Sequence, residues 1–164
     1  MAQVEACVLV PYQDGKHKSI FFGHNGEDAE TIQPRTVRRA FEVLAEDLKP
    51  REERVLSLLK GLVPQHQFDA LVLLHYQSGN RYMPAVVHLV NYKEWALLDE
   101  MWPLMAYDAQ GVFMPGLQKR RRRELGIFSD GEYGDIRAPI KLWRDDPRKT
   151  KPEPYTITVE DLAF

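Results

Sequence analysis

Five consecutive cations, from Lys119 to Arg123, are the residues of this chain whose types and spacing most clearly indicate chemistry. The chain carries 22 Lys and Arg against 24 Asp and Glu, so the rest of it is acidic. Adjacent cations repel one another, and such a run therefore indicates an anionic partner or compensating carboxylates within the fold. Arg suits phosphate because its planar guanidinium donates two parallel hydrogen bonds. The run predicts contact with nucleic acid or with a nucleoprotein complex.

The same run is compatible with two alternatives. Asp130, Glu132 and Asp135 follow it closely and could neutralise it within the fold. The run could also be a solvated loop that meets an acidic protein. On a helix, five successive residues turn through about 400°, so these cations cannot all share one face. Two or three usable arginines are the most that a helical run would offer to a partner.

A second basic group, Arg35, Arg38 and Arg39, stands in the first turns of a helix expected to open at Pro34. Helix N-termini disfavour cations but attract anions, so arginines there would reinforce an anion site. The alternative is a solvated i,i+4 pair between Arg38 and Glu42. With the run, the predicted residues for binding nucleic acid or another anionic partner are Lys119, Arg120, Arg121, Arg122, Arg123, Arg35, Arg38 and Arg39.

An enzymatic hypothesis would rest on the histidines, and the sequence gives it less support than binding. His75 and His88 fall in apolar stretches, where they could line one pocket as an acid–base pair or simply be core residues. The sequence has no HExxH motif, phosphate loop, dinucleotide fingerprint or nucleophile elbow. It therefore predicts no cofactor, no metal site and no catalytic residue.

Composition indicates one soluble α+β domain over residues 1–144, followed by a proline-rich linker and a terminal strand over 145–164. The hydrophobic fraction is 44% and the charged fraction 28%, which is ordinary for a globular protein. The lone Cys7 excludes an internal disulfide and is expected to be buried and inert. No apolar segment is long enough for a membrane span, and no basic leader precedes the first apolar run. We expect a cytoplasmic protein that has no membrane partner.

Periodicity and turn signals predict an antiparallel sheet packed against an αα-hairpin and a further helix, followed by an irregular C-terminal third with a terminal edge strand. The Asp14-Gly15 pair between two short apolar runs predicts a β-hairpin, with strands over 4–11 and 18–23. Apolar spacing predicts two helices that meet at Pro50 as an αα-hairpin, the second ending near Gly61. Further predicted elements are strands at 71–76 and 84–90, a helix at 93–101, a short helix at 117–125 and strands at 140–143 and 155–159.

Residues 70–101 allow two further interpretations. The stretch from Phe68 to Tyr76 also fits a helix, because short apolar runs do not separate helix from strand. The whole segment loosely follows a DNA-reading helix-turn-helix unit. Against that unit, Pro84 would lie in its middle helix, and the would-be recognition helix is apolar and acidic around Trp95.

Taken together, these patterns predict a small non-enzymatic binding or regulatory protein that contacts nucleic acid through a local arginine-rich patch. The alternative is a protein–protein adaptor or inhibitor that meets an acidic partner with the basic run and adds its C-terminal strand to that partner's sheet. A histidine-dependent enzyme is the third hypothesis.

Overall fold

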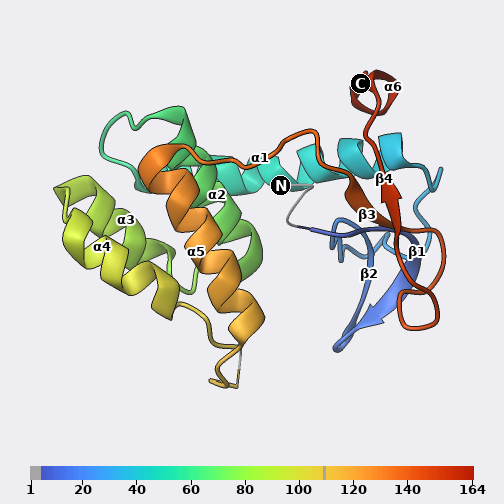
Figure 1. Ribbon diagram of the computed structural model, residues 1–164, viewed down its shortest axis with the longest axis horizontal. Helices are drawn as coiled ribbons and strands as arrows, with labels where there is room; N and C mark the ends of the chain where they lie inside the picture. The colour runs from blue at the N-terminus through green and yellow to red at the C-terminus, as the bar shows by residue number, and fades with distance from the viewer. Residues whose placement is uncertain (1–4, 109) are drawn as a thin grey trace. The chain divides into compact units, whose positions relative to one another are not determined.

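In the computed structural model, which describes residues 5–108 and 110–164, the chain divides into two compact units. The first unit comprises the residues up to Asp47 together with Asp135–Phe164, and the second comprises Leu48–Gly134. Figure 1 follows the chain by colour, with blue and red strands in the first unit and green to orange helices in the second. The C-terminal strand pairs inside the first unit, and the division of the chain after residue 144 stays a prediction.

A mixed sheet forms the first unit. Within the described residues it has four strands in the order β2-β1-β3-β4. The strands are β1 (Cys7–Asp14), β2 (His17–Phe21), β3 (Ile140–Trp143) and β4 (Glu153–Tyr155). β1 pairs antiparallel with β2 and parallel with β3, so the sheet is not purely antiparallel as predicted. The α+β class, the first hairpin and the strand at 140–143 are confirmed.

The end of the chain differs from its prediction as an alternating strand over 155–159. β4 ends at Tyr155, and a short helix, α6 (Val159–Leu162), follows it. Thr158 and Asp161 form a capping box, in which each side chain accepts a hydrogen bond from the other residue's backbone. This reciprocal cap stabilises the start of α6. The alternation of Thr and apolar residues before it had favoured a strand that continued to residue 159.

Helix α1 (Val37–Leu58) is continuous through Pro50, so the predicted αα-hairpin does not form. Its first half, up to Asp47, belongs to the first unit and its second half to the second. Proline removes one backbone donor and frees the carbonyl four residues earlier, here that of Glu46. Both Pro50 and Glu46 are exposed, so water can satisfy that carbonyl and the helix continues.

Helices build the second unit, including the region predicted as strands over 71–76 and 84–90. α2 (Gln65–Ser78) and α3 (Met83–Tyr92) occupy that region instead. Six successive residues of α2, Ala70–His75, are buried. A helix buried on all sides loses the periodic polar face that would distinguish it from a buried strand.

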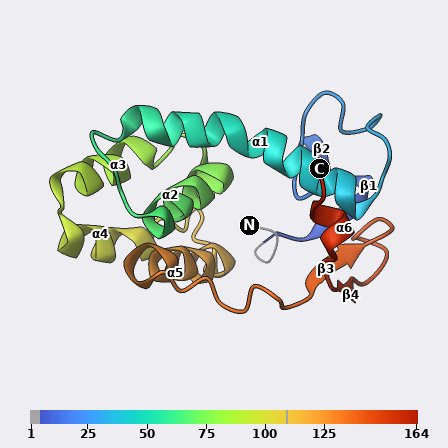
Figure 2. The same cartoon turned by 90° about the horizontal axis from the view of Figure 1, so that it is seen from above.

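The remaining helices of the second unit are α4 (Trp95–Met101), the short 3-10 turn η1 (Trp102–Leu104) and α5 (Pro115–Asp130). α4 agrees with the helix predicted over 93–101. α5 is longer than predicted, because it runs through Gly126 and ends at Gly131, whose φ of 69° suits a left-handed cap. α2 and α5 lie side by side in both views (Figure 2).

Each unit has its own apolar core. In the first, Phe22 packs on Phe41 with ring centroids 5.0 Å apart, beside the buried strand residues of β1 and β3. In the second, Trp102 is fully buried against Phe128, with ring centroids 5.3 Å apart. A search of the described residues for a helix long and apolar enough to cross a membrane found none.

Candidate functional site

The first hairpin presents the polar groups of the first unit that are best placed for chemistry. Asp14 lies at the exposed tip of β1, where it pairs with His17 across a turn whose Gly15 has a φ of 57°. Tyr12 pairs with Ser19 of β2, and Ser19 is almost fully buried. Four residue steps from Val8 to Tyr12 face only two steps on β2, so β1 bulges just before these polar residues. Bulges of this kind re-aim side chains and are frequent beside active sites.

Two carboxylates act on the Tyr12 hydroxyl. The pKa of Tyr12 is raised first by partial burial and then by the negative charges of Asp14 and Glu5, against a hydrogen bond with Ser19 that lowers it. Charges influence a pKa in this way only over short distances in a partly buried setting. Glu5, which is half-buried just before β1, and the exposed Asp14 therefore flank one hydroxyl.

Behind the hairpin, His24 ties the end of β2 to α1. Its Nδ1 lies 3.0 Å from a carboxylate oxygen of Asp47, and its Nε2 lies 2.8 Å from Asp28. Burial opposes protonation of His24, but the hydrogen bonds and charges of Asp28 and Asp47 outweigh it and raise its pKa. The same contact lowers the pKa of Asp28. The protonated imidazole thus links the hairpin to the helix through two carboxylates.

Sequence reasoning missed this group. In the sequence Asp14 is typical of a turn, and Glu5 is only a charge that argues against a signal peptide. The available signal is a glutamate and an aspartate on either side of a tyrosine, within one hairpin. It is weak, because acidic residues near exposed turns are common and nothing local distinguishes a reactive carboxylate from a solubilising one.

The basic run lies on α5, and part of it is scaffold. Arg121 has no exposed surface; its guanidinium contacts Glu124 at 3.0 Å and donates to the Gln77 amide oxygen at 2.6 Å. Arg120 lies 3.0 Å from the same glutamate, which also accepts a hydrogen bond from the Trp102 indole at 3.3 Å. Burial raises the pKa of Glu124, while the two arginines oppose that effect.

Glu124, on the same helix and four residues on from Arg120, pairs with both Arg120 and Arg121, a partner that the sequence did not indicate. Arg121 is not available to a surface phosphate. Lys119, Arg122 and Arg123 are exposed, and Arg123 donates to the Tyr133 carbonyl at 3.4 Å. Contact of these exposed cations with an acidic protein partner is untested and stays a prediction.

The second basic group, Arg35, Arg38 and Arg39, belongs to the first unit, whereas the basic run belongs to the second. The two groups therefore do not form one patch within a single unit. Arg35 donates to the Glu30 carbonyl at 3.0 Å. Arg38 lies 3.3 Å from Glu42, the i,i+4 pair considered as the alternative. Arg39 lies 3.0 Å from Glu42, whose hydrogen bond is the main cause of the raised pKa of Arg39.

The two histidines considered for catalysis have different surroundings. His75 is buried on α2, and burial, followed by the charges of Arg51 and Arg54, lowers its pKa despite a contact with Asn80. His88 is exposed on α3 and stacks on Tyr92, with ring centroids 4.6 Å apart. Among residues 5–108 and 110–164, no three His, Cys, Asp or Glu side chains are grouped as metal ligands would be.

Comparison with known proteins gives these features a context. Residues 2–124 match the family described as phage lysozyme. The chain is 31% identical over 131 residues to the endolysin of Bacillus phage PZA, covering 79% of this chain and 50% of that one. The chain spans about half the length of the curated relatives it matches.

Two solved structures share the fold. An endolysin from Escherichia coli O157:H7 phage FAHEc1 superposes with a TM-score of 0.72 at 24% identity, covering 82% of this chain and 90% of that one. The muramidase domain of SpmX from Asticaccaulis excentricus gives a TM-score of 0.67 at 24% identity, covering 77% of this chain and 89% of that one.

These matches overturn two predictions. The chain is not a nucleic-acid-binding or regulatory protein, because its sequence falls in a family named for an enzyme and its relatives are endolysins. The prediction of a non-enzymatic protein is wrong for the same reason. The error arose from treating Arg120 and Arg121 as surface residues, when the fold uses them to hold Glu124.

Proposed function

We propose that this chain hydrolyses glycosidic bonds in the glycan strands of bacterial peptidoglycan. The chain belongs to the phage lysozyme family, and the proposal follows from that membership. A muramidase acts on this glycan, and one of the chain's structural neighbours is a muramidase domain. Since the chain spans about half of its curated relatives, the proposal concerns the activity of this chain's own residues.

The observation that carries the proposal is the pair of carboxylates around Tyr12. Glycoside hydrolysis requires two carboxyl groups on either side of the scissile bond, one to protonate the leaving oxygen and one to act at the anomeric carbon. Glu5 and Asp14 both influence the Tyr12 hydroxyl; Glu5 stands just before the hairpin and is half-buried, and Asp14 stands at its exposed tip.

The surroundings of the two carboxyls divide their roles. Glu5 is half-buried and Asp14 is exposed, and the two roles of glycoside hydrolysis are assigned from this difference: the more enclosed carboxyl is the acid, and the open one faces the anomeric carbon. Glu5 is therefore the proton donor to the leaving sugar oxygen as the carbon–oxygen bond breaks. Asp14 stabilises the positive charge that develops at the anomeric carbon. Water completes the reaction by adding to that carbon, and its proton restores Glu5.

Tyr12 and Ser19 position this pair. Ser19 is nearly inaccessible, so it contacts the Tyr12 hydroxyl from within the hairpin and does not reach a substrate. The charges of both carboxylates act on the tyrosine hydroxyl. We assign both residues to positioning, because neither is required as a proton donor or as a charge at the anomeric carbon.

Product analysis tests the proposal. Purified peptidoglycan is digested with the full chain, the soluble fragments are reduced with borohydride, and mass spectrometry identifies the new ends. The proposal predicts reducing amino-sugar ends and intact peptide cross-links. New free amino groups without new reducing ends would show amide cleavage and contradict it.

The expected cytoplasmic location remains a proposal about where the chain is made and held. Peptidoglycan lies outside the cytoplasmic membrane, so the chain would have to leave that compartment to act. Fractionation of producing cells, with activity measured in each fraction, checks this point.

A further inference from the structure

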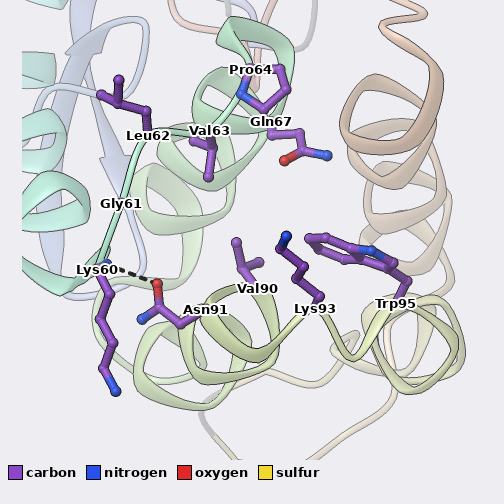
Figure 3. Close-up of a pocket in the computed structure, with 10 residues that line it drawn as sticks. All are labelled: Lys60, Gly61, Leu62, Val63, Pro64, Gln67, Val90, Asn91, Lys93 and Trp95. Carbon is purple, nitrogen blue, oxygen red and sulfur yellow. Dashed lines mark hydrogen bonds between the residues drawn. The ribbon is translucent and has the colours of Figure 1, made fainter.

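A pocket in the second unit contains polar side chains that the fold does not use. It has a volume of about 470 Å³ and forms where the connection between α1 and α2 passes the end of α3 and the start of α4. All of its lining residues lie within Leu48–Gly134, so the pocket belongs to one compact unit. Figure 3 shows these residues as sticks.

One side of the pocket is held by Asn91. Its Oδ1 accepts a hydrogen bond from the Lys60 backbone N–H at 2.9 Å, and its Nδ2 donates to the Leu58 carbonyl at 2.9 Å. The Lys60 ammonium donates to the Tyr92 hydroxyl at 3.0 Å and lies 4.6 Å from that ring's centroid. In Figure 3 this ammonium points away from the rest of the pocket, so the charge of Lys60 is engaged elsewhere.

Lys93 and Gln67 differ from Lys60 in this respect. In Figure 3 the Lys93 ammonium, the Trp95 indole and the Gln67 amide all face the space between α2 and the end of α3. Within residues 5–108 and 110–164, neither of these two side chains makes a hydrogen bond or an ion pair. Lys93 also has a φ of 58°, a conformation that favours glycine at a helix C-cap. Lys93 is thus an unpartnered cation at a backbone position where glycine would be less strained.

Trp95 supplies an aromatic wall. Its indole is 41% exposed and rests on Phe128, with ring centroids 6.0 Å apart. An exposed indole face attracts the C–H-rich face of a sugar ring, since the face of the aromatic system is negative. The pocket lining contains no acidic residue, and the Lys93 ammonium is the cation that faces the pocket, so the ligand it favours is an anion.

We propose that this pocket binds an acidic N-acetyl amino sugar of peptidoglycan. The pyranose ring lies on Trp95, a free carboxylate of the peptide attached to the sugar pairs with the Lys93 ammonium, and the Gln67 amide bonds to the N-acetyl group. The choice of peptidoglycan as the source rests on the proposed function. The pocket is then a second contact with the same polymer, made by residues other than the hairpin carboxylates.

A soluble muropeptide without a glycosidic bond tests the pocket independently of catalysis. The probe is N-acetylmuramyl dipeptide, titrated into the ¹⁵N-labelled full chain, and the neutral disaccharide N,N′-diacetylchitobiose is the comparison. The indole N–H signal of Trp95 and the side-chain amide signals of Gln67 should shift and saturate with the muropeptide. They should shift far less with the neutral sugar, because the Lys93 ammonium then lacks its anion.

Three variants assign the effect. Lys93→Gly should weaken binding about tenfold, which is the loss of one charge-assisted contact. It should not lower the unfolding temperature, because glycine relieves the positive φ. Lys93→Arg should retain most of the affinity. Lys60→Met removes an equal charge from the same pocket lining but should change the affinity less than about twofold, since that ammonium points away.

The outcomes separate this inference from the proposed function. If the Trp95 and Gln67 signals do not move at about 10 mM muropeptide, or if Lys60→Met and Lys93→Gly weaken binding equally, the pocket proposal is overturned. Wild-type release of reducing ends is measured alongside. Hydrolysis without binding here leaves the proposed function standing, whereas binding here without hydrolysis supports the pocket and overturns the hydrolytic role.

Discussion

The hairpin of the first unit and helix α5 of the second both carry charged groups, but they differ in what surrounds those groups. On α5, Arg121 and Glu124 are withdrawn from solvent and satisfy one another. On the hairpin, Asp14 is exposed and Glu5 half-buried, and both act on one tyrosine. The charges that dominate the sequence thus hold the fold together, while the inconspicuous ones remain available to a substrate.

Asp14→Asn should have a larger effect than any substitution outside the pair of Glu5 and Asp14. It removes the charge that stabilises the developing cation, and the rate of reducing-end release should fall by a factor of about a hundred or more. The unfolding temperature should stay close to that of the wild type, because Asp14 is exposed. Glu27→Gln, at another exposed acid of the same unit, is the matched control and should keep full activity.

Glu124→Gln should have the next largest effect, and the effect should be on stability. Without the carboxylate, the guanidinium of Arg121 is buried beside a neutral amide, a change that typically costs about 3–5 kcal/mol. Urea unfolding followed by tryptophan fluorescence measures it. Glu132→Gln, at one of the acids that the sequence indicated as the neutralising group, is the control; a larger loss there than at Glu124 would refute the assignment.

The link through His24 makes the stability of the first unit depend on pH. The pKa of His24 is raised on folding, so its contribution is full below its ordinary value of 6.5 and is lost as the pH rises through the folded value. The pKa of Asp28 is lowered, so its contribution is present above 3.8 and is lost as the pH falls. Stability from this link is therefore greatest between these two values.

Thermal unfolding at pH 5.5 and pH 8 checks the link. The wild type should be more stable at pH 5.5 by about 1 kcal/mol from this group, a modest figure because solvent screens part of the pair. His24→Asn should abolish the difference, and His88→Asn, at an exposed histidine of the second unit, should leave it unchanged. A difference that persists in the His24 variant would contradict this role.

The smallest effect is expected at the exposed pair of Arg38 and Glu42. Exposed i,i+4 pairs contribute little, so Arg38→Gln should shift the unfolding temperature by less than about 2 °C. Peptidoglycan hydrolysis should be unchanged. A large loss of activity on this substitution would restore a functional role for the second basic group.

Local chemistry accounts for the elements that could be predicted. The Asp14-Gly15 turn and the short apolar run of β3 carry their own signals, and both appear where they were expected. The continuity of α1 could not be foreseen, because it depends on Pro50 and Glu46 facing solvent. α2 is the helix that the sequence allowed over Phe68–Tyr76 as the alternative to a strand, and its buried residues leave no polar face that would have decided between the two.

The candidate site was harder to predict than the fold. The charge of Arg121 is visible in the sequence, but its burial depends on packing beside Glu124 and Gln77. Glu5 and Asp14 are nine positions apart, and only the bulged hairpin brings both near the Tyr12 hydroxyl. Tertiary packing therefore decides which charges are structural and which are available for chemistry.

The central claim is that the chemistry resides in the hairpin carboxylates, and Glu5→Gln tests it most directly. The measurement is the initial rate of reducing-end release from purified peptidoglycan, expressed per folded molecule. We predict that the variant unfolds at the wild-type temperature and is slower by a factor of about a thousand, the contribution of a positioned general acid. A folded Glu5→Gln variant that hydrolyses peptidoglycan at the wild-type rate would contradict the claim.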